Sequence, residues 1–303
     1  MKPNAARAAS APPDRVRLVI VVAFIVVIFF AVAFVVWRFK WGPCPKGFPR
    51  VLAYHKVTKF ELGGTWLTRG QFKRQIESLQ RKGFRFISES EFIDTLEGRR
   101  QGSSREVLIT FDDGYAGLID FALPFLAERH IPALIFLVTA FAGEDNSWEL
   151  GLPFRRFKHM SWDDVTDLAA RGFSFGSHTR THRDLTRLSV DDLLEEVAGS
   201  KRELEARISR EVRSISYPFG RSNEGVRSAV LNAGYRAAFS LYPSRRNDSI
   251  DRYCLRRDGV YVIDTPFTVL MKLGGGPLFW LEDLKGRLIN AFSVLTPLLK
   301  QER

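Results

Sequence analysis

Two clusters of side chains in this 303-residue chain could support metal-assisted chemistry. Asp112 and Asp113 follow the apolar run 106–111, and His178 and His182 lie four residues apart. Imidazoles at this spacing share one face of a helical turn, where they could bind a divalent metal together with a carboxylate. Two histidines and one carboxylate leave coordination positions open for water and substrate, as a catalytic metal site requires.

Both clusters also have a purely structural interpretation. An Asp-Asp-Gly sequence often only closes a strand with a turn, and the segment 177–182 could be a solvated polar turn. Neighbouring residues that leave a strand point in different directions, so one aspartate could bind a metal while the other faces a substrate. The chain has five histidines, and two of them lie in this one segment, which favours the metal interpretation.

Short β-rich runs alternate with amphipathic helices along most of the chain. The strand candidates are 51–54, 84–87, 106–111, 133–139, 173–176, 212–217, 235–239 and 259–263. Helices are expected at 71–81, from Ser88, and near 117–129, 162–171, 190–208 and 223–233. This alternation predicts an α/β fold with a parallel sheet, closed into a distorted (β/α) barrel of TIM type with about seven or eight strands.

Polar residues follow four of these predicted strands directly. In (β/α) barrels the reacting groups lie at the C-terminal ends of the strands. His55, the pair Asp112 and Asp113, His178, and the segment 218–220 all occupy such positions. We therefore expect them to meet at one rim of the barrel.

Three motifs resemble those of the polysaccharide deacetylases, which are carbohydrate esterase family 4 and contain the NodB-homology domain. These motifs are ITFDDG at 109–114, SHTRTH at 177–182 and YPFG at 217–220, and the resemblance extends over residues 50–262. The motifs occur in order, and each has the expected strand before it. The resemblance implies a distorted barrel enzyme that removes acetyl groups from N-acetylated sugars.

The resemblance also implies a division of roles within the site. Asp113, His178 and His182 would bind a divalent metal, and Asp112 would be the general base. The metal would be Zn²⁺, with Co²⁺, Ni²⁺ or Mn²⁺ as alternatives. Such an ion lowers the pKa of a bound water and polarises the amide carbonyl.

The third motif departs from the more common form of the family. Tyr217 stands where an arginine that orients the base is usual, and either Arg256 or Arg257 could supply that cation from another strand. Tyr217, Pro218 and Phe219 are the candidates for substrate contact, and a backbone N–H in this region would help to hold the oxyanion.

The acid that protonates the leaving nitrogen is expected to be His55. The usual Leu-x-His motif is missing after residue 240, whereas His55 follows the first predicted strand. Residues 52–55 resemble the N-terminal YH motif of a branch of the family whose acid lies on the first strand. The alternative is a histidine that only packs against the barrel or caps it.

A second feature of the sequence is a twenty-residue stretch without a charge, residues 18–37. A helix of this length spans about 30 Å, the hydrocarbon thickness of a bilayer. A signal peptide would have a shorter apolar core and a small-residue cleavage site, but Arg38 and Lys40 follow this stretch. We predict a single uncleaved transmembrane helix, with the N-terminus cytoplasmic and the body periplasmic or extracellular.

The net charge of +11 is concentrated around this stretch. Residues 1–50 hold eight Lys or Arg and one Asp, which leaves only +4 for the other 253 residues. A nucleic-acid-binding surface needs a stronger positive field on the folded body. We therefore expect no nucleic-acid partner.

The predicted parts are an arm, a membrane helix, a linker, a catalytic domain and an amphipathic helical segment, at 1–17, 18–37, 38–50, 51–265 and 266–303. The last segment could be an outer helix of the barrel or a second membrane contact. Cys44 and Cys254 could form a disulfide in an oxidising compartment, or be unrelated thiols.

These features together favour a membrane-anchored, metal-dependent hydrolase that removes N-acetyl groups from an amino-sugar polysaccharide at the cell surface. Its expected partners are an N-acetylated glycan, such as peptidoglycan or an exopolysaccharide, and the membrane. One alternative is a deacylase of a lipid-linked sugar. Another is an inactive carbohydrate-binding relative, which the intact aspartates and histidines disfavour.

Overall fold

The structure, a computed structural model, describes residues 22–30, 33, 47–59, 64–145, 157–243, 250–274 and 278–293. The chain divides into two units, residues 1–41 and residues 42–303. Within the described ranges, no helix has the length and apolar character needed to cross a bilayer. Part of the predicted membrane helix and Cys44 lie outside these ranges, so the membrane helix and the disulfide stay predictions.

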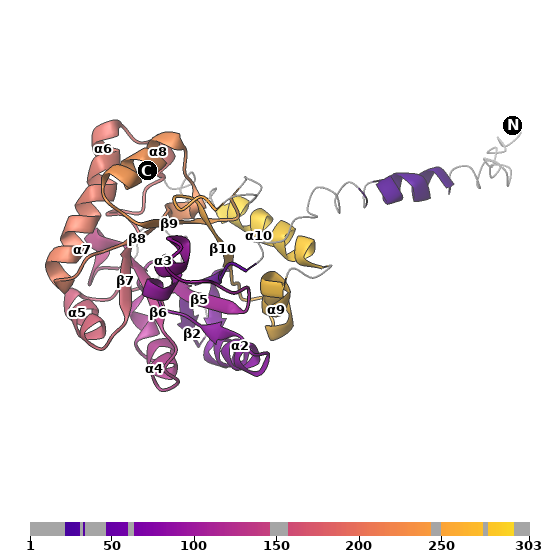
Figure 1. The fold of residues 1–303 in the computed structure, drawn as a ribbon, viewed down its shortest axis with the longest axis horizontal. Helices are drawn as coiled ribbons and strands as arrows, with labels where there is room; N and C mark the ends of the chain where they lie inside the picture. The colour runs from indigo at the N-terminus through magenta and orange to yellow at the C-terminus, as the bar shows by residue number, and fades with distance from the viewer. Residues whose placement is uncertain are drawn as a thin grey trace, which may run out of the picture. The chain divides into compact units, whose positions relative to one another are not determined.

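Seven parallel strands form a closed barrel in the second unit (Figure 1). The ring closes because β1 pairs with β5 on one side and with β10 on the other. Its strands are β1 (Arg50–Tyr54), β5 (Glu106–Phe111), β6 (Ala133–Leu137), β7 (Ser174–Ser177), β8 (Ser214–Ser216), β9 (Ala237–Leu241) and β10 (Leu255–Gly259). The predicted barrel is therefore confirmed.

In the described part of the chain, three further short strands lie outside the ring. β4 (Arg85–Phe86) was among the predicted strands, and it pairs only with the first two residues of β5. β2 (Lys56–Thr58) and β3 (Trp66–Thr68) form a separate two-stranded sheet that the sequence did not predict. Three residues each are too few for a clear alternation of apolar and polar residues.

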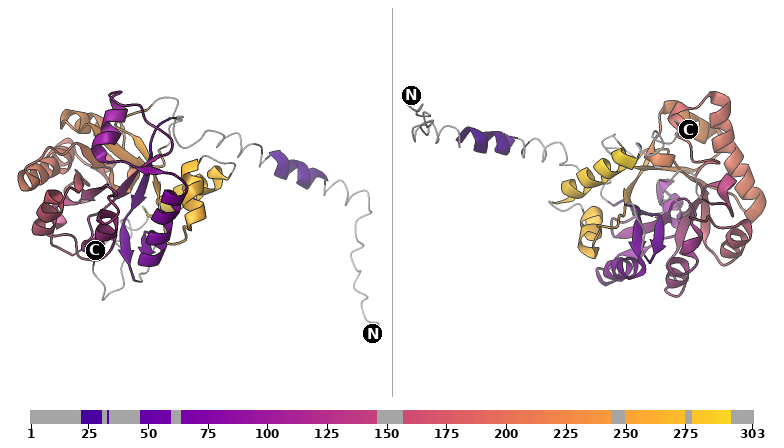
Figure 2. Two further views of the ribbon diagram at one scale, coloured as in Figure 1. Left: turned by 60° about the horizontal axis from the view of Figure 1, so that its bottom comes forward. Right: turned by 180° about the vertical axis from the view of Figure 1, so that it is seen from behind.

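Most of the helices lie around the outside of the ring of strands (Figure 1, Figure 2), and α3 (Glu89–Leu96) lies over its centre in Figure 1. The described helices are α2 (Arg69–Arg81), α3 (Glu89–Leu96), α4 (Ala122–Ala127), α5 (Trp162–Ala170), α6 (Val190–Leu194), α7 (Ser200–Ile208), α8 (Glu224–Asn232), α9 (Pro266–Gly274) and α10 (Phe279–Ser293). Capping boxes begin α3 at Ser88 and α5 at Ser161, because each serine and the acid three residues later satisfy each other's backbone N–H. A π-helical turn, Glu195–Gly199, joins α6 to α7.

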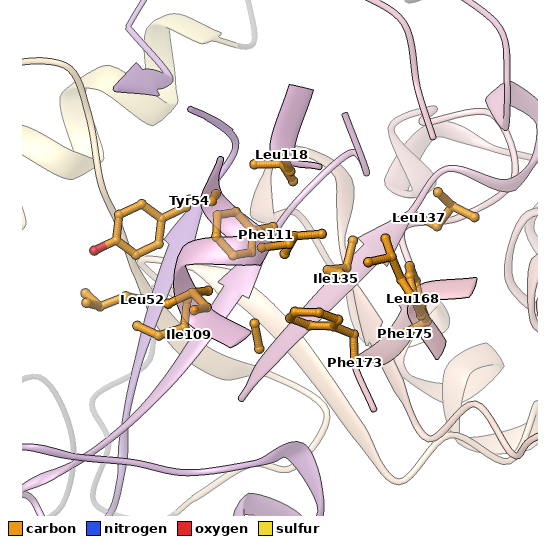
Figure 3. Close-up of a cluster of buried hydrophobic side chains, with 14 of the residues drawn as sticks. Leu52, Tyr54, Ile109, Phe111, Leu118, Ile135, Leu137, Leu168, Phe173 and Phe175 are labelled. Carbon is orange, nitrogen blue, oxygen red and sulfur yellow. The ribbon is translucent and has the colours of Figure 1, made fainter. Parts of the chain in front are cut away.

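Alternate residues of the strands face two different hydrophobic cores. Leu52, Tyr54, Ile109 and Phe111 belong to the layer between the strands and the outer helices (Figure 3). The intervening residues line the barrel interior with Leu134, Phe136, Ala237, Phe239 and Leu255. This period of two is what a parallel strand buried on both faces requires. The filled interior leaves the rim of the barrel as the place for polar chemistry.

The last strand corrects one prediction. The sequence favoured 259–263 as a strand, but β10 is Leu255–Gly259, with the sequence LRRDG. All five residues are buried, and the charges of Arg256 and Asp258 are paired with each other at 2.6 Å. The prediction was wrong because buried, paired charges look like a solvated loop in the sequence.

Candidate active site

Asp113, His178 and His182 meet at the C-terminal rim of the barrel. Asp113 follows β5 and the two histidines follow β7. One ligand atom of each residue lies within 4.8 Å of the others, and all three side chains are buried. The Nε2 atoms of both histidines are 3.5 Å from the same oxygen, Oδ1 of Asp113. The three residues predicted as metal ligands are therefore brought together, and they could hold a divalent metal.

The protonation of these histidines suits a metal. The Nδ1 atom of His178 lies 2.8 Å from the carbonyl oxygen of Ser216, to which it donates, so Nε2 keeps its lone pair for a metal. Burial lowers the pKa of His178, and the nearby Asp112 charge only partly opposes this. Burial, followed by the proximity of His178, puts the pKa of His182 well below its ordinary value. Neutral imidazoles are the form that binds a metal.

Asp112 is clamped by a buried arginine. Arg257 donates from Nη1 to Oδ1 of Asp112 at 2.6 Å and from Nη2 to Oδ2 at 2.8 Å. The guanidinium is itself held by the hydroxyls of Ser216 at 2.6 Å and Thr110 at 3.2 Å. Burial, the largest single effect, would raise the pKa of Asp112. The charges of Arg257, His178 and His55 and the hydrogen bonds from Arg257 together outweigh it, and the pKa lies far below the ordinary value. Asp112 is thus ionised and fixed in orientation.

The second candidate for this role, Arg256, points elsewhere. Its guanidinium is paired with Asp258 and with Asp283 of α10, each at 2.6 Å. Consecutive residues of a strand point to opposite faces, so only one of the two arginines can reach the barrel interior. Arg256 ties β10 to α10 and does not contact Asp112.

The backbone around the site contains several left-handed residues. Asp113, Thr179, His182 and Phe219 have φ values of 67°, 66°, 59° and 58°. Each such conformation costs a non-glycine residue on the order of 1 kcal/mol or more, and such residues concentrate at functional sites. They also correct the prediction that His178 and His182 share a helical turn. The two residues lie in an irregular loop, because left-handed residues cannot continue a right-handed helix.

The turn after β8 places Phe219 beside the metal ligands. The ring centroid of Phe219 is 4.9 Å from that of His182. The Tyr217 N–H donates to the Phe239 carbonyl at 2.9 Å, and its hydroxyl donates to the Tyr253 carbonyl at 2.9 Å. Tyr217 therefore cannot supply the predicted oxyanion N–H, and Pro218 has none. Of the three predicted residues, Phe219 is the one left for that role.

Two residues that support this turn were not predicted. Asn290 of α10 donates to the Phe219 carbonyl at 3.1 Å, and Ser240 donates to the Gly220 carbonyl at 2.6 Å. Gly220 has a φ of 66°, and a Cβ atom added to it would lie only 2.5 Å from the Leu241 nitrogen. The turn therefore requires glycine at this position. No local pattern in the sequence links Asn290 to a turn about 70 residues earlier, so only the fold reveals it.

His55 lies at the same rim, directly after β1 and half-buried. Burial is the largest influence on the pKa of Asp112, which it raises, and on that of His182, which it lowers. A positive charge on His55 is a smaller influence that lowers both pKa values, so His55 lies near both groups. His159 is a further residue that the sequence did not single out. It is buried, and its Nδ1 atom lies 2.7 Å from the Asp113 carbonyl oxygen, to which it donates.

A cavity of about 560 Å³ opens next to Phe219. Its lining includes Arg221, Arg227, Ser240 and Asn290. Phe219 lines this cavity and its ring also lies against that of His182, whereas none of the candidate metal ligands lines the cavity. It offers hydroxyl, amide and guanidinium groups, which suit a polar ligand.

Comparison with known proteins agrees with this geometry. The sequence model of a family described as polysaccharide deacetylase matches residues 99–238. YxkH of Bacillus subtilis, a proposed polysaccharide deacetylase, is 26% identical over 207 residues, which cover 68% of this chain and 69% of the relative. The poly-beta-1,6-N-acetyl-D-glucosamine N-deacetylase of Staphylococcus epidermidis is 27% identical over 215 residues, covering 68% of this chain and 71% of that protein.

Solved structures share the fold. IcaB from Ammonifex degensii matches with a TM-score of 0.62 and 24% identity over 76% of this chain and 97% of its own. The Streptococcus pyogenes deacetylase PplD, in complex with acetate, matches with a TM-score of 0.62 and 21% identity over 74% of this chain and 97% of its own. At these identities the likeness is one of fold.

Proposed function

We propose that this chain, which matches the polysaccharide deacetylase family model over residues 99–238, hydrolyses the N-acetyl amide bonds of an amino-sugar polysaccharide with the help of a divalent metal ion. The observation that supports this most strongly is the pairing of two adjacent aspartates with different surroundings. Asp113 faces two neutral imidazoles, whereas Asp112 is ionised and held by Arg257. One carboxylate is thus arranged for a metal and the other for a proton.

The residues of the site can be given distinct steps. When bound to Asp113, His178 and His182, a divalent ion such as Zn²⁺ would supply a water of lowered pKa and polarise the amide carbonyl. Asp112 accepts the proton of the attacking water, and Arg257 keeps its oxygens in place. The Phe219 N–H donates to the developing oxyanion. His55 gives a proton to the leaving nitrogen as the C–N bond breaks.

The substrate we favour is a polymer of N-acetylglucosamine. Several relatives bear the name poly-beta-1,6-N-acetyl-D-glucosamine N-deacetylase. The cavity of about 560 Å³ beside Phe219 is large enough for a sugar unit next to the reacting one. Its hydroxyl and amide groups can hydrogen-bond to sugar hydroxyls.

We test this function by acetate release from the full-length protein on β-1,6-linked and β-1,4-linked N-acetylglucosamine oligomers and on peptidoglycan. We expect release from at least one of these, loss of release after chelation, and recovery on adding Zn²⁺. Asp113→Ala is the matched control, because it should release no acetate whether or not Zn²⁺ is added. Release that persists after complete metal removal would contradict the metal-dependent mechanism.

We further propose that residues 18–37 anchor the protein in the membrane, with the catalytic unit exported. The support is the uncharged twenty-residue stretch between basic segments. A phosphatase reporter fused after Arg303, active only outside the cytoplasm, is expected to be active. The same fusion without residues 1–37 should be inactive. Activity of a reporter that works only in the cytoplasm would contradict the proposed orientation.

A further inference from the structure

Glu196 is a buried acid that lies outside the predicted catalytic set. It is only 4% exposed and sits in the π-helical turn between α6 and α7. Neither the metal-binding residues nor the proton-transfer residues include it. A buried carboxylate needs strong hydrogen bonds to offset the loss of water, so its contacts should show what it is for.

The Glu196 carboxylate binds the loop that joins the two metal histidines. Its Oε2 atom accepts from the backbone N–H groups of Arg180 at 2.9 Å and Thr181 at 2.8 Å. Its Oε1 atom accepts from the Thr181 hydroxyl. All three donors belong to residues between His178 and His182, so one side chain holds the centre of this loop.

Ser200, the first residue of α7 after this π-helical turn, supports the beginning of the loop. The Ser200 hydroxyl lies 2.7 Å from the hydroxyl of Ser177, which accepts from the Thr179 N–H at 3.0 Å. Thr179 in turn accepts from the His182 N–H at 3.1 Å. These contacts form a continuous chain from the helix to both ends of the loop. These hydrogen bonds therefore stabilise the left-handed backbone of Thr179 and His182.

We propose that Glu196 is a positioning residue that fixes the separation of the His178 and His182 imidazoles and thereby sets the affinity for the metal. The inference rests on the proposed metal role of the two histidines. Its hydrogen bonds to the loop are made with Arg180 and Thr181, which lie between the two histidines. Without its carboxylate, the N–H groups of Arg180 and Thr181 lose their acceptor, and the loop is free to relax away from the geometry that the metal needs. Residues that orient metal ligands in this way typically change metal affinity about 10–100-fold when altered.

The test is the dissociation constant for Zn²⁺ in the full-length protein, measured by competition with a chromogenic chelator. We expect Glu196→Gln to bind Zn²⁺ about 10–100-fold more weakly than wild type, and Glu196→Ala to bind it more weakly still. Glu195→Gln is the matched control, because it removes the same charge from the adjacent residue, whose side chain is 54% exposed and lies 3.6 Å from the Arg180 guanidinium instead of bonding to the loop backbone. Its dissociation constant should equal that of wild type.

A second readout separates positioning from a general structural role. At saturating Zn²⁺, Glu196→Gln should regain most of the wild-type kcat, because its catalytic groups are intact. Thr181→Val removes only the hydroxyl contact with Glu196, so its Zn²⁺ affinity should lie between those of wild type and Glu196→Gln. This variant keeps the test informative if the Glu196 variants do not fold. If wild type, Glu196→Gln and Thr181→Val bind Zn²⁺ with equal affinity, the positioning role of Glu196 is overturned, but the proposed metal site is not. A wild-type protein that binds no Zn²⁺ would overturn the proposed metal site and this role with it.

Discussion

Asp112→Asn is expected to keep the metal and lose about 10³-fold in kcat, since removal of a general base typically costs 10²–10⁴-fold. The amide has nearly the shape of the carboxylate and can still accept one hydrogen bond from Arg257 through its single oxygen, but it cannot take a proton. The metal ligands Asp113, His178 and His182 are unchanged. Metal content and acetate release, measured on the same preparation, check the expectation.

Asp113→Ala is the contrasting change at the neighbouring position. It removes the carboxylate whose Oδ1 lies 3.5 Å from both histidine Nε2 atoms, so metal content and activity should fall together. The two aspartates thus separate metal binding from proton transfer. Acetate release at a near wild-type rate in Asp112→Asn would refute the assignment of the base. Loss of metal in Asp112→Asn would show that the two carboxylates share the ion.

Asp112→Asn also has a stability cost that must be measured beside its activity. Removing one partner of a buried ion pair typically costs about 3–5 kcal/mol, because the other charge is left unpaired. Arg257 is fully buried, and its hydrogen bonds to the hydroxyls of Ser216 and Thr110 do not neutralise its charge. A thermal melt of the variant therefore shows whether lost turnover reflects chemistry or a smaller folded fraction.

The sequence predicted which residues lie at the rim of the barrel better than it predicted the residues that hold them in place. Asp113, His178 and His182 each come directly after or near the end of an apolar strand, and in a closed parallel sheet all such ends lie at one rim. Strand order along the chain is sufficient for that inference. No distance or angle is needed, which explains why the sequence could predict that these three residues meet.

The supports were harder to predict because they depend on contacts distant in sequence. The sequence left Arg256 and Arg257 as equal candidates, and only the register of β10 decides which one enters the barrel. The histidine loop was assigned to a helix because a spacing of four fits one. Its backbone is held by side chains distant in sequence: Glu196 accepts from the loop N–H groups, and Ser200 contacts the Ser177 hydroxyl that accepts from the Thr179 N–H. Such acceptors have no local signature.

His55 illustrates both the strength and the limit of this reasoning. Its position after β1 predicts that it lies at the catalytic rim, and the structure places its charge near Asp112 and His182. The position alone does not distinguish an acid from a histidine that packs. Chemistry can distinguish the two, because an amide and an activated ester differ in how much they need a proton on the leaving group.

His55→Ala is therefore expected to lose about 10²–10³-fold in amide hydrolysis, the usual contribution of a general acid, while metal content and fold stay unchanged. An amine anion is too poor a leaving group to depart without a proton, whereas a nitrophenolate needs little help. Hydrolysis of p-nitrophenyl acetate should consequently fall by about tenfold or less. His130→Asn is the matched control, since His130 is exposed with a φ of 52° that asparagine tolerates. It should retain both activities. Equal losses on the amide and the ester in His55→Ala would reject the acid role, because a defect in folding or metal binding affects both substrates alike.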